Sequence, residues 1–224
     1  RAPGAFFSFI TAVLLAYEPA KRLARLQVDL NGALVGVSML YTFLDEKEVE
    51  PNLYDGPPLK VFRGEIEFRD VTFSYRPGEP VLQGLSFVAE AGKMTALVGR
   101  SGGGKSTVMS LLLQYWHAGG GGILVDGQDI SSVSRASLRQ QIAYVSQDTY
   151  LFKGTIKDNI SVGKQGATDE EVFAAAKAAY AHDFISSFDD GYQTQVGENG
   201  AQLSGGQRQR IAIARAFLKN APIL

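Results

Sequence analysis

The 224-residue sequence contains no cysteine, so it can form neither a disulfide bond nor a cysteine-ligated metal site. It has no run of lysine and arginine, and its formal net charge is −1. Proteins that bind nucleic acid concentrate basic residues, so this composition argues against a nucleic-acid partner. No internal repeat is present, and 45% hydrophobic with 20% charged residues is typical of a globular protein.

The sequence also lacks an uncharged run long enough to cross a bilayer alone. Ala5–Tyr17 is apolar, but as a helix it extends about 20 Å, against a hydrocarbon core of about 30 Å. It can be the apolar region of a signal peptide, a core helix, or the end of a membrane-spanning helix. Lys21, Arg22 and Arg25 follow it, which is typical of the cytoplasmic side of a membrane. No starting Met or cleavage site supports the signal peptide.

Residues 5–44 have helical periodicity, with an expected kink at Pro19. Apolar residues then recur at three- and four-residue spacing, which indicates a helical face that packs against another helix. They are Leu23, Leu26, Leu30, Leu34, Val37 and Leu40. We therefore expect residues 1–44 to form one helical segment, 45–60 a polar linker, and 61–224 a globular domain.

From Val61 onward, strand-like and helix-like segments alternate, which predicts a layered α/β domain. We expect a short hairpin within 66–73, and strands at 81–88, 94–98, 123–125 and 142–145, with another beginning at 223–224. A turn at Asp126-Gly127 is expected to close the strand at 123–125. We expect helices at 105–115, within 155–188 and at 204–218.

A complete phosphate-binding pattern, G-x-x-x-x-G-K-[ST], lies between a predicted strand and a predicted helix. Its residues are Gly99, Arg100, Ser101, Gly102, Gly103, Gly104, Lys105, Ser106 and Thr107. The glycines let successive backbone N–H groups point at an anion, and the helix that follows adds its positive end. Lys105 can reach the β- and γ-phosphates, and the Ser106 hydroxyl can bind Mg²⁺. Glycine-rich turns before helices are common, but the full motif in this context predicts nucleotide binding.

A second glycine-rich element, Ser204-Gly205-Gly206-Gln207, begins the last predicted helix. Ser204 and Gln207 satisfy a capping box, but a cap requires no glycine. Each glycine inside a helix costs about 1 kcal/mol relative to Ala. We therefore expect Gly205 and Gly206 to leave backbone N–H groups open to an anion.

These two elements, in this order, resemble those of the nucleotide-binding domain of ATP-binding cassette (ABC) proteins. With the apolar amino-terminal segment, the chain resembles the back part of an ABC exporter subunit of the lipid or multidrug type. The resemblance implies a P-loop NTPase α/β core with an antiparallel β subdomain and an α-helical subdomain, after a long helix from the transmembrane domain. It implies ATP and Mg²⁺ as cofactors. It also implies a head-to-tail dimer, in which the signature loop, Ser204–Gln207, covers ATP held by the other subunit.

Further positions match this family. Tyr75 matches the aromatic residue that stacks on adenine, although a lone strand tyrosine is more often a packing residue. Gln147 matches the glutamine that contacts Mg²⁺ or the attacking water, so the resemblance implies Ser106 and Gln147 as metal ligands and Lys105 and Gln147 as catalytic residues. Glu198 matches a glutamate typical of exporters.

Other positions depart from the family or lie outside its motifs. Gly103 and Asn199 replace the usual Ser and Arg, and the resemblance places the catalytic glutamate and the switch histidine beyond Leu224. We therefore expect this chain to bind ATP but to hydrolyse it weakly. Trp116 is expected to pack or to lie at the surface, and neither His117 nor His182 matches a functional position.

The resemblance implies the ATP-binding part of an exporter that couples ATP binding and hydrolysis to transport across the inner (plasma) membrane, with the ATPase domain on the cytoplasmic side. The implied partners are a second ABC subunit, the membrane, and coupling helices of the transmembrane domain, for which residues 150–152 offer an apolar surface. The alternatives are a soluble ABC ATPase, importer-associated or non-transport, and a nucleotide-binding fragment without efficient hydrolysis. Lipids, drugs and peptides all remain open as transport substrates.

Overall fold

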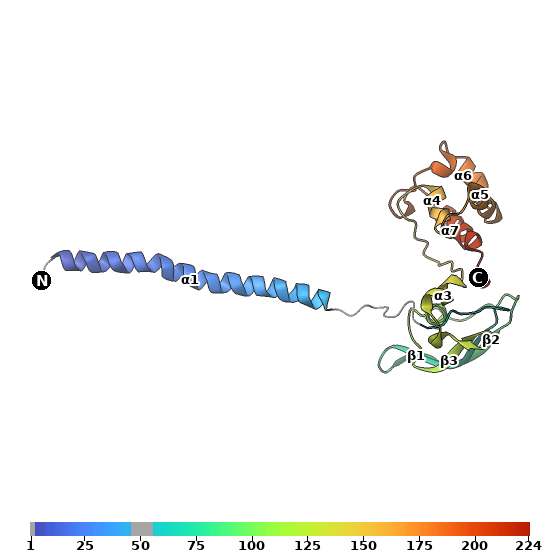
Figure 1. The fold of residues 1–224 in the computed structure, drawn as a ribbon, viewed down its shortest axis with the longest axis horizontal. Coiled ribbons are helices and arrows are strands. Elements are labelled where there is room, and N and C mark those ends of the chain that lie inside the picture. Colours follow the sequence, from blue (N-terminus) through green and yellow to red (C-terminus); the bar gives the residue numbers. More distant parts are fainter. Residues whose placement is uncertain (1–2, 46–55) are drawn as a thin grey trace. The chain divides into compact units, whose positions relative to one another are not determined.

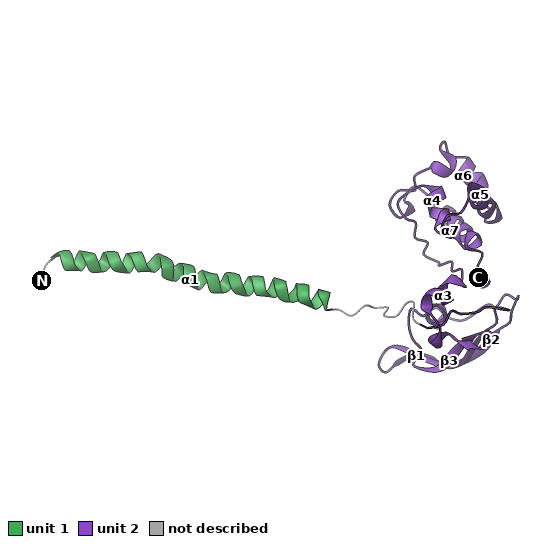
Figure 2. Ribbon diagram, in the orientation of Figure 1, with its two compact units in different colours: residues 1–51 green, residues 52–224 purple. Residues whose placement is uncertain are grey.

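The computed structural model describes residues 3–45 and 56–224. The chain divides into two compact units, Arg1–Pro51 and Asn52–Leu224 (Figure 2). Most of the predicted linker, 45–60, lies outside the described residues.

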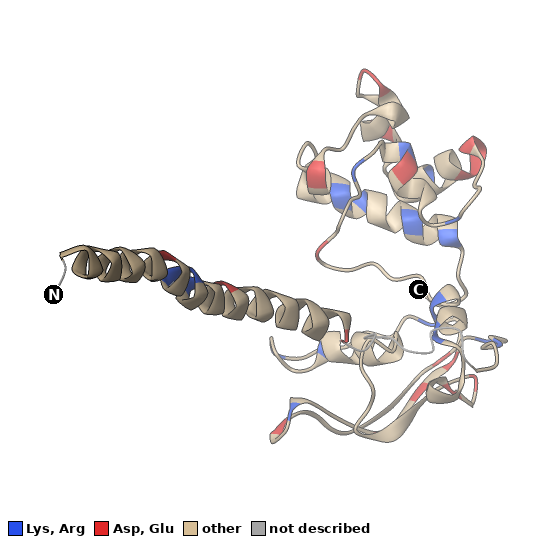
Figure 3. Cartoon of the chain, turned by 60° about the vertical axis from the view of Figure 1, so that its left-hand side comes forward, with Lys and Arg blue, Asp and Glu red and all other residues tan. Residues whose placement is uncertain are grey.

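The first unit consists of one helix, α1 (Pro3–Leu44), in agreement with the predicted helix. The helix continues through Pro19 and contains no buried residue. It is long and apolar enough to cross a membrane, judged by length and composition. Its charged side chains gather in its middle, between two uncharged ends (Figure 3). Near its start, the hydroxyls of Ser8 and Thr11 donate hydrogen bonds to helix carbonyls one turn earlier, so these hydroxyl donors are satisfied without water.

The second unit contains a four-stranded antiparallel sheet of order β2-β1-β3-β4. Figure 1 labels β1, β2 and β3 of this sheet. The strands are β1 (Ile66–Arg76), β2 (Glu79–Ala89), β3 (Gly120–Val125) and β4 (Gln128–Asp129). The predicted hairpin within 66–73 is wrong, because these residues belong to the single strand β1, and the hairpin is formed by β1 with β2. The predicted turn after Val125 is present, with φ of 48° at Asp126 and 76° at Gly127. Positive φ at both positions gives the twist that a two-residue hairpin turn requires.

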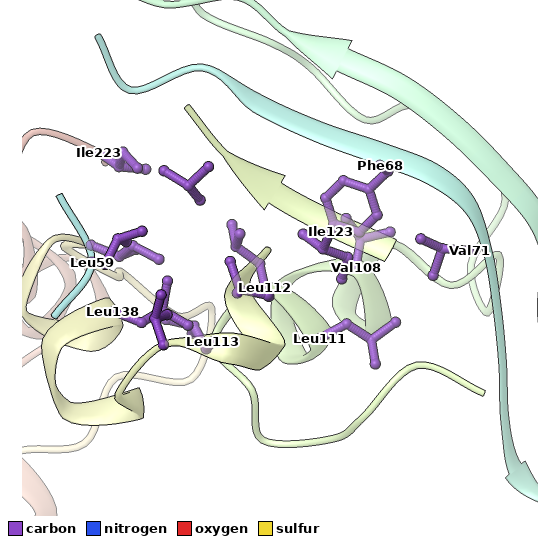
Figure 4. Close-up of a cluster of buried hydrophobic side chains, with 14 of the residues drawn as sticks. Leu59, Phe68, Val71, Val108, Leu111, Leu112, Leu113, Ile123, Leu138 and Ile223 are labelled. Atoms are coloured by element: carbon purple, nitrogen blue, oxygen red, sulfur yellow. The ribbon is translucent and has the colours of Figure 1, made fainter. Parts of the chain in front are cut away.

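One apolar core joins this sheet to α2 (Lys105–Leu112) and α3 (Arg135–Gln140). Figure 4 shows Phe68 and Ile123 of the sheet against Val108 of α2. On the sheet, Phe68 also stacks on Phe87, with ring centroids 4.7 Å apart. This packing fixes the helix that follows the phosphate loop against the sheet.

A second apolar core lies among four helices, α4 (Ile156–Ser161), α5 (Asp169–Ala178), α6 (His182–Ser186) and α7 (Gly205–Lys219). The predicted helical regions are therefore confirmed. Capping boxes at Thr155 and Thr168 satisfy backbone donors at the starts of α4 and α5, which explains where these helices begin.

Two predicted strands are not formed in the described residues. Residues 94–98 have no regular secondary structure, and Met94 and Val98 are 98% and 94% exposed. Residues 142–145 contribute only one parallel bridge, between Ile142 and Ile223. A strand requires a neighbour for its N–H and C=O groups, and no described strand lies beside 94–98.

The Asp126 carboxylate organises the entry to the second unit. It accepts hydrogen bonds from four successive backbone N–H groups, of Phe62, Arg63, Gly64 and Glu65, at 2.6, 2.9, 3.1 and 3.0 Å. Partial burial raises the pKa of this carboxyl, but the four donors together outweigh that effect and lower it from 3.8 to about 2. The ionised form is therefore the one that holds residues 62–65 against the β3–β4 turn.

We predict that Asp126→Asn lowers the free energy of unfolding by about 1.5–3 kcal/mol, the range for hydrogen bonds to charged groups. Asn also tolerates the left-handed backbone, so the change removes mainly the charge. Because the folded pKa lies below the unfolded one, the contribution is complete above pH 4 and is lost as pH falls toward 2. Urea unfolding at several pH values measures this. Asp70→Asn is the matched control, since Asp70 is exposed and has φ of 49°; equal losses in both variants would contradict the role of Asp126.

Candidate nucleotide-binding site

The phosphate loop has the backbone geometry that its glycines predict. Gly102 and Gly104 have φ of 79° and 81°, in the left-handed region that favours glycine. A Cβ at Gly104 would lie 2.7 Å from the Leu82 side chain, so this position also lacks room for a larger residue. At Gly103 a Cβ would lie 3.1 Å from the Arg100 carbonyl oxygen, so a serine there needs only a small shift.

Helix α2 begins with unblocked backbone donors. Its N-cap residue is Gly104, and no side chain caps its first turn. The first helical hydrogen bond runs from Val108 N to Gly104 O, so the N–H groups of residues 105–107 have no partner within the helix. The Lys105 ammonium donates to the carbonyls of Gly99 and Arg100, at 3.0 and 2.7 Å. Free N–H groups, a helix N-terminus and a cation thus meet at one exposed loop, which suits an anion.

Tyr75 lies beside this loop. Its hydroxyl is 3.1 Å from the Thr107 Oγ1 of α2, which is buried. Tyr75 is 46% exposed, and its ring makes edge contacts with Phe73 and Trp116, at centroid distances of 4.8 and 5.3 Å. The structure thus brings the predicted base-stacking residue to the phosphate loop, with part of its ring open to solvent.

The signature loop forms the predicted capping box. Gln207 N donates to Ser204 Oγ at 3.2 Å, and Ser204 N donates to Gln207 Oε1 at 2.8 Å. A Cβ at Gly206 would meet nothing within 4 Å, and one at Gly205 would touch only the Arg208 guanidinium, at 3.9 Å. Neither glycine has positive φ. Packing and backbone geometry therefore require no glycine here, which favours contact with a group outside this chain.

Gln147 lies with the signature loop. A groove of about 440 Å³ is lined by Gln147, Asp148, Thr149, Glu198, Asn199, Ala201, Gly205 and Arg208. Within the described part of the chain, no hydrogen bond joins Gln147 to residues 99–107. The structure thus gathers the predicted site residues into two groups, one at the phosphate loop and one at the start of α7.

The segment 150–152 is only partly the surface that the sequence predicted. Tyr150 and Phe152 are 57% and 52% exposed, but Leu151 is fully buried in the helical core. Including Leu151 in the apolar surface was therefore wrong. Alternation along an extended segment sends adjacent side chains to opposite sides, which explains the difference.

Two residues that the sequence analysis missed hold this segment. The Asn159 side chain exchanges two hydrogen bonds with the Phe152 backbone, each 2.9 Å, and the Arg215 guanidinium donates to the Tyr150 carbonyl at 2.7 Å. Asn159 and Arg215 are 56 positions apart, so no pattern of neighbouring residues in the sequence predicts that they pair. By contrast, the two histidines contact neighbours away from both loops: His182 bonds Tyr192, and His117 bonds Arg135.

The comparisons with known proteins agree with this geometry. The family model for the ABC transporter matches residues 82–224. A protein of Sinorhizobium fredii described as an uncharacterized ABC transporter ATP-binding protein is 54% identical over 222 residues. An ATP-dependent lipid A-core flippase of Legionella pneumophila (strain Lens) is 47% identical over 222 residues. In each case the match covers 99% of this chain, but only 38% and 37% of the relative.

A solved bacterial Atm1-family ABC exporter with ATP bound matches the structure with a TM-score of 0.80 at 42% identity. The match covers 85% of this chain and 33% of the exporter chain. The predicted fold class, an ABC ATPase domain with an antiparallel sheet, a helical part and a long amino-terminal helix, is therefore confirmed. On the family model and these relatives together, the chain belongs to the ABC transporter family.

Proposed function

We propose that this chain is the ATP-binding part of an ABC exporter subunit, which couples ATP binding and hydrolysis to substrate export. The observation that carries the proposal is the uncapped start of α2 behind Gly104, with the Lys105 ammonium at the same loop. Polyphosphate requires several donors and a compensating charge at close range, and this loop provides both.

ATP and Mg²⁺ fit the donor set that is present. The described residues contain no cluster of three or more His, Cys, Asp or Glu that could hold a metal. Mg²⁺ in such sites is bound mainly through substrate phosphates and water, so it needs few protein ligands. We assign the Ser106 hydroxyl to this role. The Gln147 amide oxygen would be a second ligand only after Gln147 moves to the phosphate loop, because in this structure it lines the groove beside Gly205. When bound, the ion neutralises phosphate charge, while residues 99–107 orient the nucleotide and Tyr75 stacks on its base.

A second ABC subunit is the proposed partner of the signature loop. Gly205 and Gly206 weaken α7 without serving its packing, and their open N–H groups suit a phosphate brought by another molecule. A head-to-tail pair, homodimeric or heterodimeric, places Ser204–Gln207 of one subunit over ATP held by the other.

The membrane is the other proposed partner, with the ATPase domain on the cytoplasmic side of the inner membrane. The uncharged first part of α1 and its central basic residues suit the end of a membrane helix that continues into the cytoplasm. Tyr150 and Phe152 would contact coupling helices of the transmembrane domain. A soluble ABC ATPase is less favoured, because α1 is long and apolar enough to cross a membrane, judged by length and composition.

We predict that Lys105→Ala weakens ATP binding about 10- to 150-fold, the loss expected for one hydrogen bond from a charged donor. Isothermal titration calorimetry with Mg·ATP measures the change. Lys93→Ala is the matched control, because Lys93 is 67% exposed and pairs only with Glu90 among the described residues. Unchanged affinity in Lys105→Ala would overturn the assignment of the phosphate loop.

We predict that Tyr75→Ala weakens ATP and GTP binding to a similar extent and leaves pyrophosphate binding unchanged. Stacking recognises the face of a ring and not its pattern of donors and acceptors, so the two purines should lose equally. The same calorimetry, with three ligands, separates base binding from phosphate binding. Normal ATP affinity in the variant would restrict Tyr75 to a packing role.

We predict that the 224-residue chain hydrolyses bound ATP slowly, because none of its residues matches the glutamate with which the family activates water. Absence of a positioned general base typically costs about 10²–10⁴-fold in rate. Phosphate release measured at saturating Mg·ATP tests this. Rapid turnover that depends on Mg²⁺ would indicate a catalytic base elsewhere in the chain.

A further inference from the structure

Trp116, the single tryptophan of the chain, lies beside the proposed base-binding residue. It follows α2 and is 49% exposed. Its ring is 5.3 Å from Tyr75 at an interplanar angle of 89°, and 6.1 Å from Phe73 at 61°. Only part of the Trp116 surface is used by these contacts.

Trp116 and Tyr75 form an apolar corner next to α2. Both residues are about half exposed, and the planes of their rings are perpendicular. The bond between the Tyr75 hydroxyl and Thr107 ties this corner to the helix that begins at the phosphate loop. A flat base that lies parallel to one ring is therefore perpendicular to the other. Parallel offset and edge-to-face contacts are the two favourable arrangements of aromatic rings, and the corner offers both.

We infer that Trp116 is a second wall of the nucleobase site, and that a purine base contacts it as well as Tyr75. The inference rests on the proposed function, since it assumes a nucleotide at the phosphate loop. It adds a residue to which the sequence analysis gave only a packing or surface role. A polyphosphate without a base should bind with the same affinity whether or not Trp116 is present.

A purely structural role for Trp116 makes a different prediction. If Trp116 only holds the Tyr75 ring in place, its loss has no effect once Tyr75 has been removed. If Trp116 contacts the base, its loss weakens binding in either background. A double-mutant cycle separates the two roles.

The experiment measures ATP, GTP and tripolyphosphate binding to four forms: the wild-type chain, Trp116→Leu, Tyr75→Ala and the double variant. Leucine keeps an apolar side chain but removes the aromatic ring. We expect Trp116→Leu to weaken ATP and GTP about 2- to 12-fold, the range for one aromatic contact. We expect a comparable loss in the Tyr75→Ala background and unchanged affinity for tripolyphosphate. Phe62→Ala, which removes an aromatic ring that is 78% exposed, is the matched control.

Tryptophan fluorescence of the unmodified chain gives a second measurement that needs no variant. ATP and GTP should change the emission of Trp116, whereas tripolyphosphate at saturation should leave it close to that of the free chain. This readout keeps the inference testable if Trp116→Leu does not fold.

The outcomes distinguish this inference from the proposed function. Binding that depends on Lys105, with equal nucleotide affinity in wild type and Trp116→Leu, would overturn the role of Trp116 alone. An effect that vanishes in the Tyr75→Ala background would reduce Trp116 to a support for Tyr75 and would also overturn it. Absence of any ATP or tripolyphosphate binding would overturn the proposed function and this inference together.

Discussion

One buried amide, Asn159, holds together the helical part of the second unit. Its side chain is on α4 and the residue is 1% exposed. Its oxygen accepts from Phe152 N and the Arg215 guanidinium, at 2.9 and 2.5 Å, and its nitrogen donates to the carbonyls of Phe152 and Thr155, each at 2.9 Å. An amide offers two donors and two acceptor sites, and here all are used. A buried polar network stabilises a fold when every member is satisfied, which is the case for this amide.

Arg215 extends this network to the helix that begins with the signature loop. Its guanidinium also donates to the Asn159 and Tyr150 carbonyls, at 2.6 and 2.7 Å. Burial lowers the pKa of Arg215, yet a guanidinium remains charged in proteins, so its bonds stay charge-assisted. The exposed rings of Tyr150 and Phe152 are therefore tied to α7 through the same buried groups. A displacement of this segment must either break these bonds or move α7, which gives the proposed membrane contact a physical link to the signature loop.

The sequence predicts those parts of the fold that depend on neighbouring residues. The capping box at Ser204, the turn at Asp126 and the glycines of the phosphate loop each act within a few positions, and the structure has all three. The prediction of a strand at 94–98 was wrong, because a strand forms only when a second segment pairs with it, and an apolar run does not reveal whether such a segment is present. The sequence did not predict the Asn159–Arg215 pair or the contact between Trp116 and Tyr75, because each joins residues far apart in the chain.

The position of Lys105 affects how much binding energy the phosphate loop can provide. Its ammonium already donates to two loop carbonyls. A bound phosphate must therefore replace these hydrogen bonds and does not simply add new ones. The net gain is the difference between a neutral carbonyl and an anionic phosphate oxygen as acceptor for the same charged ammonium, which is the attraction between two opposite charges. In return, the lysine is held at the loop before the nucleotide arrives, and less of its side-chain entropy remains to be lost on binding. The uncapped N–H groups of residues 105–107 have no partner within the helix that a phosphate must replace. Their hydrogen bonds to phosphate therefore lose less of their binding energy to exchange than those of Lys105.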